Sequence, residues 1–156
     1  MMRRHDQSPT PTTGPLYLRP AYLGLAFLGG ALGTAIRYGL TLAFPGSGQA
    51  MGAILAINLV GAFCLGYLLE ALGRRGDDVG TRRTVRVLVG TGALGGFTTY
   101  STLATNVVEL LGSGRIWTGI GYALLTVVVG VVASGAGILV AARTTTPVRN
   151  DERTAA

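Results

Sequence analysis

Long apolar segments separated by short polar ones dominate the chain. Four of them, residues 21–44, 50–72, 85–111 and 116–142, are long enough to cross a bilayer as helices, which takes about 20 residues each. The flanking residues 1–19 and 143–156 are rich in Pro, Thr and charge, so we expect a disordered lead-in and a polar tail. The pattern predicts an all-α membrane protein with a four-span domain over residues 20–142.

The third segment contains the most polar run of the apolar region. Its sequence GTGALGGFTTYST (residues 90–102) is rich in glycines and hydroxyl groups. An interrupted helix is tolerated at membrane depth only where it is buried in protein or lines a polar cavity. We therefore predict a helix break whose carbonyls bind a cation, with the amides and hydroxyls of Ser101 and Thr102 available to an anion. A glycine-rich packing seam, with hydroxyls bonded back to their own helix, is the alternative.

The distribution of charge predicts the orientation of the chain. All 13 basic residues are Arg; Arg115 lies alone on one side and Arg37 lies within a span. The other eleven share a side with both termini: Arg3, Arg4, Arg19, Arg74, Arg75, Arg82, Arg83, Arg86, Arg143, Arg149 and Arg153. The positive-inside rule then predicts that both termini are cytoplasmic. Because these arginines flank membrane spans, we expect no nucleic-acid binding despite the net charge of +6.

The other three spans also carry polar side chains at membrane depth. Arg37 ends a small-residue face of the first span, Asn58 lies among small residues of the second, and Tyr122 and Thr126 begin a polar stripe on the fourth. Each of them alone is equally consistent with interhelical hydrogen bonding, core packing or snorkelling to the interface. Together they favour a pathway, because polar groups inside a membrane usually mark one.

The chemistry of these groups favours a small anion. Arg, Asn, Ser, Thr and Tyr side chains all donate hydrogen bonds, whereas Glu70 and Glu109, the acidic residues nearest the spans, lie at span ends. A small multidrug exporter, which exchanges protons for cationic drugs at a membrane carboxylate, is a remote alternative. The sequence has no Walker loop, Ser/His/Asp set or metal-ligand spacing, so we do not expect an enzyme.

Three motifs resemble the CrcB/Fluc family of fluoride channels in order and spacing: GGALGTAIRY (29–38), NLVGAFCLG (58–66) and GTGALGGFTTYST (90–102). The resemblance covers residues 20–142. It implies a four-span subunit of the cell membrane that forms an antiparallel dimer, with two fluoride pores at the dimer interface and passive export of cytoplasmic fluoride. It also implies a structural sodium ion at the centre, held by carbonyl oxygens of Gly95 and Thr98.

The same resemblance assigns roles to further residues. Arg37 would lie near an aqueous vestibule, and the fluoride pathway would comprise Asn58, Tyr100, Ser101, Thr102, Tyr122 and Thr126. Two positions depart from the pattern of the family. The family usually has two phenylalanines in this motif, and here Tyr100 replaces the first and Leu103 the second. Asn106 stands where a glutamate is usual and has no assigned role.

The charge asymmetry bears on the identity of the dimer partner. An antiparallel homodimer requires one sequence to insert in both orientations, and a distribution of eleven arginines to one opposes this. We therefore expect a heterodimer with a paralogous subunit of opposite orientation, which would supply a fuller set of phenylalanines. A non-conducting or assembly subunit is the alternative, given Leu103.

Overall fold

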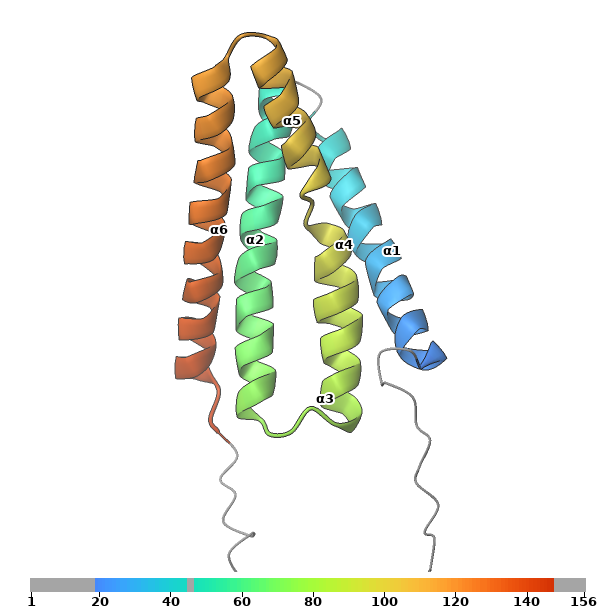
Figure 1. Cartoon of the computed structure of the whole chain (residues 1–156). Helices are drawn as coiled ribbons and strands as arrows, with labels where there is room; N and C mark the ends of the chain where they lie inside the picture. The colour runs from blue at the N-terminus through green and yellow to red at the C-terminus, as the bar shows by residue number, and fades with distance from the viewer. Residues whose placement is uncertain (1–18, 45–46, 148–156) are drawn as a thin grey trace, which may run out of the picture.

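The computed structural model of the chain describes residues 19–44 and 47–147, and all regular secondary structure in these ranges is helical (Figure 1). The all-α class is therefore confirmed. In chain order the helices are α1 (Pro20–Leu42), α2 (Ser47–Arg74), α3 (Gly80–Val85), the π-helical η2 (Arg86–Leu94), α4 (Gly95–Phe97), α5 (Ser101–Gly112) and α6 (Ile116–Thr144).

Three of these helices, α1, α2 and α6, are long and apolar enough to cross a membrane. They correspond to the predicted spans 21–44, 50–72 and 116–142, with ends that differ by up to three residues. An i,i+4 ion pair between Glu70 and Arg74, 2.6 Å from Nε to Oε1, supports the last turn of α2, which ends two residues beyond the predicted boundary. α1 ends two residues early, ahead of Pro45, which disfavours helical backbone in the residue before it.

The third apolar segment is a composite rather than one long helix. α3, η2 and α4 follow one another without a gap, so helical structure begins at Gly80, five residues before the predicted start. Thr98 then has extended backbone, with φ −77° and ψ 157°, and helical structure resumes at Ser101. The predicted break is confirmed, but it occupies only residues 98–100, and the glycine-rich part of the motif is helical.

Gly92 and Gly96 of the composite segment pack directly against α1, whereas Gly90 faces leucines of α2 and Gly95 is exposed. A Cβ added at Gly29 of α1 would overlap the carbonyl oxygen of Leu88, and one at Gly33 would overlap that of Ala93. Both glycines are buried. Backbone therefore meets backbone along this contact, which we call the glycine seam. The packing alternative is correct for Gly92 and Gly96, and for the Thr98 hydroxyl, which bonds back to the carbonyl of Leu94, but not for Thr99.

A second close contact joins α2 to α6. A Cβ at Gly66 of α2 would overlap the carbonyl oxygen of Ser134, and a Cβ at Gly137 of α6 would overlap that of Phe63. In Figure 1, α2 lies between α6 and the composite segment, and α1 lies on the far side of α4. The break is thus positioned by α1 on one side and by α2 on the other.

Seven of the nine described arginines gather at one end of the helical bundle; of the other two, Arg37 lies within α1. The start of α1, the end of α6 and the α2–α3 connection lie together there, and the α5–α6 connection lies at the opposite end (Figure 1). The first end carries Arg19, Arg74, Arg75, Arg82, Arg83, Arg86 and Arg143, whereas Arg115 precedes α6 at the other. Arg3, Arg4, Arg149 and Arg153 lie outside the described residues, as do residues 1–18 of the predicted lead-in and 148–156 of the predicted tail.

The outer surface of the bundle is apolar. Phe27 of α1 is 73 % exposed and Val131 of α6 is 69 % exposed, while the described part of the chain has a small buried core that includes Ile54 and Leu110. An exposed apolar surface of this extent suits contact with lipid or with a partner subunit.

Candidate functional site

The candidate site is the break at residues 98–100, where α2 replaces the hydrogen bonds that a continuous helix would make. The Asn58 side chain donates from Nδ2 to the carbonyl oxygen of Thr99 at 3.0 Å and accepts from the Thr99 amide at Oδ1 at 2.8 Å. The carboxamide therefore acts as a substitute peptide group. Since an unpaired buried backbone group costs about 1–3 kcal/mol, this clamp stabilises the interruption.

Three hydroxyl groups meet at the start of α5. Thr99 Oγ1 lies 3.0 Å from Ser101 Oγ and 3.2 Å from Thr102 Oγ1, and it accepts from the Thr102 amide at 3.2 Å. Ser101 is exposed and Thr99 is buried. We call Thr99, Ser101 and Thr102 the hydroxyl cluster. Hydroxyls at a helix N-terminus present donors toward an anion, and the macrodipole of α5 has the favourable sign.

Thr99 is the residue of this cluster that sequence reasoning missed. Its neighbours Ser101 and Thr102 were singled out because they begin the second half-helix, whereas Thr99 precedes it. The available signal was the run TTYST itself, in which a threonine two residues before a helix is well placed to bond the first turn.

The break also diverts hydrogen-bond donors from carbonyl groups of the preceding turn, among them those of Gly95 and Thr98. In a continuous helix the Thr99 amide would serve the carbonyl of Gly95, and the Thr102 amide would serve that of Thr98. Here the two amides donate instead to Asn58 Oδ1 and Thr99 Oγ1. Carbonyl oxygens without helical donors are suitable ligands for an alkali cation, so Gly95 and Thr98 fit the sodium role that the family resemblance implies.

The carbonyl of Gly96, by contrast, is held by α1. It accepts hydrogen bonds from Thr34 Oγ1 and Arg37 Nε, both at 3.3 Å. The Arg37 guanidinium, which is half-buried, therefore lies beside the last turn before the break. Its predicted position near an aqueous vestibule stays a prediction.

Tyr122 and Thr126 lie on α6 and bond to backbone oxygens of their own subunit. The Tyr122 hydroxyl donates to the carbonyl of Met51 on α2 at 3.2 Å, and Thr126 Oγ1 donates to the carbonyl of Tyr122 at 2.8 Å. Thr126 is only 7 % exposed. No hydrogen bond among the described residues joins this pair to the hydroxyl cluster, so their place in one continuous pathway stays a prediction.

The residues that depart from the family pattern differ in exposure: Tyr100 is exposed, whereas Leu103 and the amide nitrogen of Asn106 are buried. The ring of Tyr100 is 81 % exposed at the break, whereas Leu103 is 6 % exposed and packs inside the subunit. The Asn106 Nδ2 atom is buried and has no hydrogen-bond partner among the described residues. Asn106 lies one turn after Thr102 on α5, so it adds an unpaired donor near the hydroxyl cluster.

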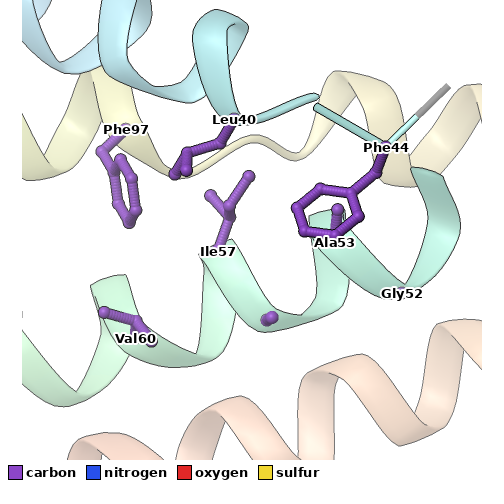
Figure 2. Close-up of a pocket in the computed structure, with 8 residues that line it drawn as sticks. Leu40, Phe44, Gly52, Ala53, Ile57, Val60 and Phe97 are labelled. Carbon is purple, nitrogen blue, oxygen red and sulfur yellow. The ribbon is translucent and has the colours of Figure 1, made fainter. Parts of the chain in front are cut away.

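An apolar pocket of about 570 Å³ lies beside the break (Figure 2). Phe97, the last residue before the break, lines it together with Leu40 and Phe44 from the end of α1 and Ile57 and Val60 from α2. Figure 2 shows only carbon in the side chains around this space. The pocket therefore suits an apolar side chain or a lipid chain rather than an ion.

Comparisons with known proteins give one consistent result. A family model described as "CrcB-like protein, Camphor Resistance (CrcB)" matches residues 24–138. The chain is 45 % identical over 128 residues to "Fluoride-specific ion channel FluC 2" of Leifsonia xyli subsp. xyli, covering 82 % of this chain and 88 % of that protein.

Two further relatives show similar coverage. The chain is 49 % identical to "Fluoride-specific ion channel FluC 1" of Cutibacterium acnes over 119 residues, 76 % of this chain and 83 % of that protein. It is 39 % identical to "Fluoride-specific ion channel FluC" of Deinococcus radiodurans over 127 residues, 80 % of this chain and 97 % of that protein. These relatives and the three long apolar helices support a multi-pass membrane protein.

Proposed function

The chain belongs to the CrcB-like family, and on this premise we propose that it is a subunit of a fluoride-selective passive channel that exports cytoplasmic fluoride across the cell membrane. The observation that carries the proposal is the hydroxyl cluster, held at a helix break by the carboxamide of Asn58. Relatives named as fluoride-specific ion channels support a channel rather than an enzyme.

We infer four membrane passes, of which the composite segment α3–η2–α4–α5 is the third. In support, the start of α1 and the end of α6 lie at the same end of the bundle, as an even number of passes requires (Figure 1). We infer that this end is the cytoplasmic one, an inference that the seven described arginines there support through the positive-inside rule.

In the proposed mechanism, hydrogen-bond donors replace the water that fluoride loses. Fluoride is small and strongly hydrated, so it needs compact donors at close range. Ser101 and Thr102 supply hydroxyls at the N-terminus of α5, and Asn58 and Asn106 each retain a carboxamide N–H. The exposed ring of Tyr100 supplies a positive edge beside them. Tyr122 and Thr126 continue the pathway on α6.

A structural sodium ion would be held by the carbonyl oxygens of Gly95 and Thr98. When bound, it would supply a fixed positive charge that lowers the cost of bringing an anion into the bilayer. Both carbonyls are left free of their helical donors, since Asn58 takes the amide of Thr99 and the Thr99 hydroxyl takes that of Thr102. The ion is structural and is not transported.

We further propose that the functional unit is an antiparallel heterodimer with a paralogous subunit. The asymmetry of the arginines, the burial of Leu103 and the exposure of Tyr100 support this, because this chain offers one aromatic ring to a shared pore rather than two. The numbers in the names FluC 1 and FluC 2 of two relatives are consistent with organisms that have two such chains. A non-conducting assembly subunit is the second candidate, favoured by the same burial of Leu103.

Fluoride efflux from liposomes tests the function. The purified chain is reconstituted alone and with its paralogue, in sodium buffer and in buffer with an organic cation instead, and a fluoride electrode records the release. We expect release with the paralogue in sodium, little with the chain alone, and loss of release after sodium is exhaustively removed.

Each failure of this experiment has a different meaning. Absence of release in every combination would overturn the channel assignment for this chain. Equal release from the chain alone would refute the heterodimer, and release that does not depend on sodium would refute the structural ion. If Asn58→Asp in this chain leaves the release of the pair unchanged, the assembly-subunit role replaces the conducting one.

A further inference from the structure

A cavity of about 430 Å³ lies at the basic end of the bundle, between the first turns of α1 and the start of the composite segment. Its apolar walls include Tyr22, Leu23 and Ala26 of α1, together with Val87 and Thr91 of η2. Two arginines close one side of it, Arg83 of α3 and Arg86 of η2. The cavity therefore combines two positively charged side chains with an apolar wall, which distinguishes it from both the hydroxyl cluster and the buried apolar core.

The two arginines differ in how far their donors are used. Arg86 binds both oxygens of Asp78, donating from Nε to Oδ1 at 3.0 Å and from Nη2 to Oδ2. Arg83 Nε lies 3.6 Å from Asp78 Oδ2, too far for a hydrogen bond. That Nε atom is buried and has no hydrogen-bond partner among the described residues. Arg83 is therefore ion-paired with Asp78 but makes no hydrogen bond among the described residues, so its half-buried guanidinium keeps donors for an acceptor in this cavity.

We propose that this cavity binds an anionic phospholipid, whose phosphate accepts hydrogen bonds from Arg83 and Arg86 while an acyl chain lies along Tyr22, Leu23 and Val87. Arg83 lies three residues and Arg86 six residues beyond the start of α3, which at 1.5 Å per residue is about 5–9 Å along the helix axis. That depth matches the headgroup region when the basic end faces the cytoplasm. Basic pockets between helices on that side of a membrane suit anionic headgroups.

A neighbouring cavity shows why this one is preferred. It measures about 270 Å³, lies between α2 and α3, and is lined by Arg75 and Arg82 beside Tyr67. Arg82 Nε already donates to the carbonyl of Asp77 at 2.8 Å. Arg75 is exposed, whereas Arg83 and Arg86 are both half-buried beside an apolar wall, so the α1 side is the site of choice.

Native mass spectrometry of the purified full-length channel, titrated with phosphatidylglycerol or with phosphatidylcholine of the same acyl chains, tests the site. We expect saturable binding of phosphatidylglycerol and an affinity at least about tenfold weaker for Arg83→Gln, because a charge-assisted hydrogen bond is lost. Asp78→Asn should bind severalfold more tightly, since it removes a competing carboxylate from Arg86. Arg143→Gln, an exposed arginine at the same end on α6, is the matched control and should bind as the parent does.

Three results would overturn the proposal. Equal weakening by Arg83→Gln and Arg143→Gln would mean diffuse attraction to the basic end rather than a site. Equal binding of phosphatidylcholine, or displacement of phosphatidylglycerol by millimolar inorganic phosphate, would exclude a lipid bound by both headgroup and chain. Absence of any saturable lipid would mean that another occupant, such as the partner subunit, covers the cavity. Because binding is read without fluoride flux, these outcomes do not depend on the channel function.

Discussion

The two halves of the GTGALGGFTTYST motif lie next to each other and are held in opposite ways. The glycine half, in η2 and α4, is helical and packs backbone to backbone on α1. The hydroxyl half leaves the helix at Thr98 and is held by side chains, Asn58 from α2 and Thr99 from within. Close helix packing requires residues without side chains, whereas an ion site requires polar side chains. The motif meets the first requirement in its glycine half and the second in its hydroxyl half.

The largest effect should come from filling the glycine seam. Gly33→Leu places a side chain where the carbonyl oxygen of Ala93 lies, and backbone cannot move aside as a flexible side chain can. We expect a loss of at least about 3 kcal/mol of stability, seen as failure to yield a monodisperse protein in size-exclusion chromatography.

Gly39→Leu is the matched control for the seam. Gly39 lies on the same helix as Gly33, and a Cβ added there would meet nothing within 4 Å. It should give a normal elution profile when purified in the same way. Equal yields of the two variants would show that α1 does not pack on η2 as described.

The second largest effect should come from the clamp on the hydroxyl half. Asn58→Leu leaves the amide and the carbonyl of Thr99 without partners, at a cost of about 2–6 kcal/mol for the two groups together. We expect a lower melting temperature in detergent and no measurable fluoride release. Asn58→Asp keeps the acceptor for the Thr99 amide, so it should assemble better than Asn58→Leu and still fail to conduct. Release at the parent rate from either variant would rule out the clamp as part of the conducting structure.

A smaller effect is expected within the hydroxyl cluster. Thr99→Val removes the oxygen that contacts Ser101 and Thr102 but keeps the shape of the side chain. We expect about 1 kcal/mol of lost stability and roughly tenfold slower fluoride release, measured in liposomes. Thr105→Val is the control, since Thr105 Oγ1 only bonds back to the carbonyl of Ser101 on its own helix, and it should conduct normally.

The smallest effect concerns a charge pair outside both halves. The hydrogen bond from Arg86 is the main cause that holds the pKa of Asp78 below its ordinary value; desolvation opposes it, and the charges of Arg86 and Arg83 add to the lowering. A carboxyl with a lowered folded-state pKa stabilises the fold above its unfolded pKa, and that contribution is lost as pH falls through the folded value. Melting temperatures of the parent and Asp78→Asn should therefore differ by a small, constant amount from pH 8 to 5 and converge only below about pH 4. A difference that disappears already at pH 6 would contradict this assignment.

The sequence predicted much of the fold because hydropathy is a local property. The spans that became α1, α2 and α6 were located to within three residues, and the break was expected inside residues 90–102. Its exact place was not predicted, because a run of glycines lowers helix propensity whether or not the helix breaks there. Gly92 and Gly96 of this run pack on α1 in helical conformation, and only the tertiary fold contains that contact.

Candidate site residues were predicted by type, and their partners were not. That Asn58, Ser101 and Thr102 would lie at membrane depth followed from their places in apolar segments. That Asn58 pairs with Thr99, that Arg37 and Thr34 hold the carbonyl of Gly96, and that Leu103 faces inward depends on helices separated by dozens of residues. No local pattern encodes such pairings.

By itself the sequence determined that this protein is helical, that three of its helices are long and apolar, that its arginines lie mostly on one side, and that the apolar segment 85–111 is interrupted. Each of these properties belongs to a stretch of neighbouring residues. Tertiary structure alone decided which carbonyl oxygens lose their helical donors, where three hydroxyls meet, and that Arg83 lies beside an apolar cavity with an ion pair but no hydrogen bond at Nε. Those outcomes depend on distances between helices, and in a chain where backbone packs on backbone a single methyl group is enough to change them.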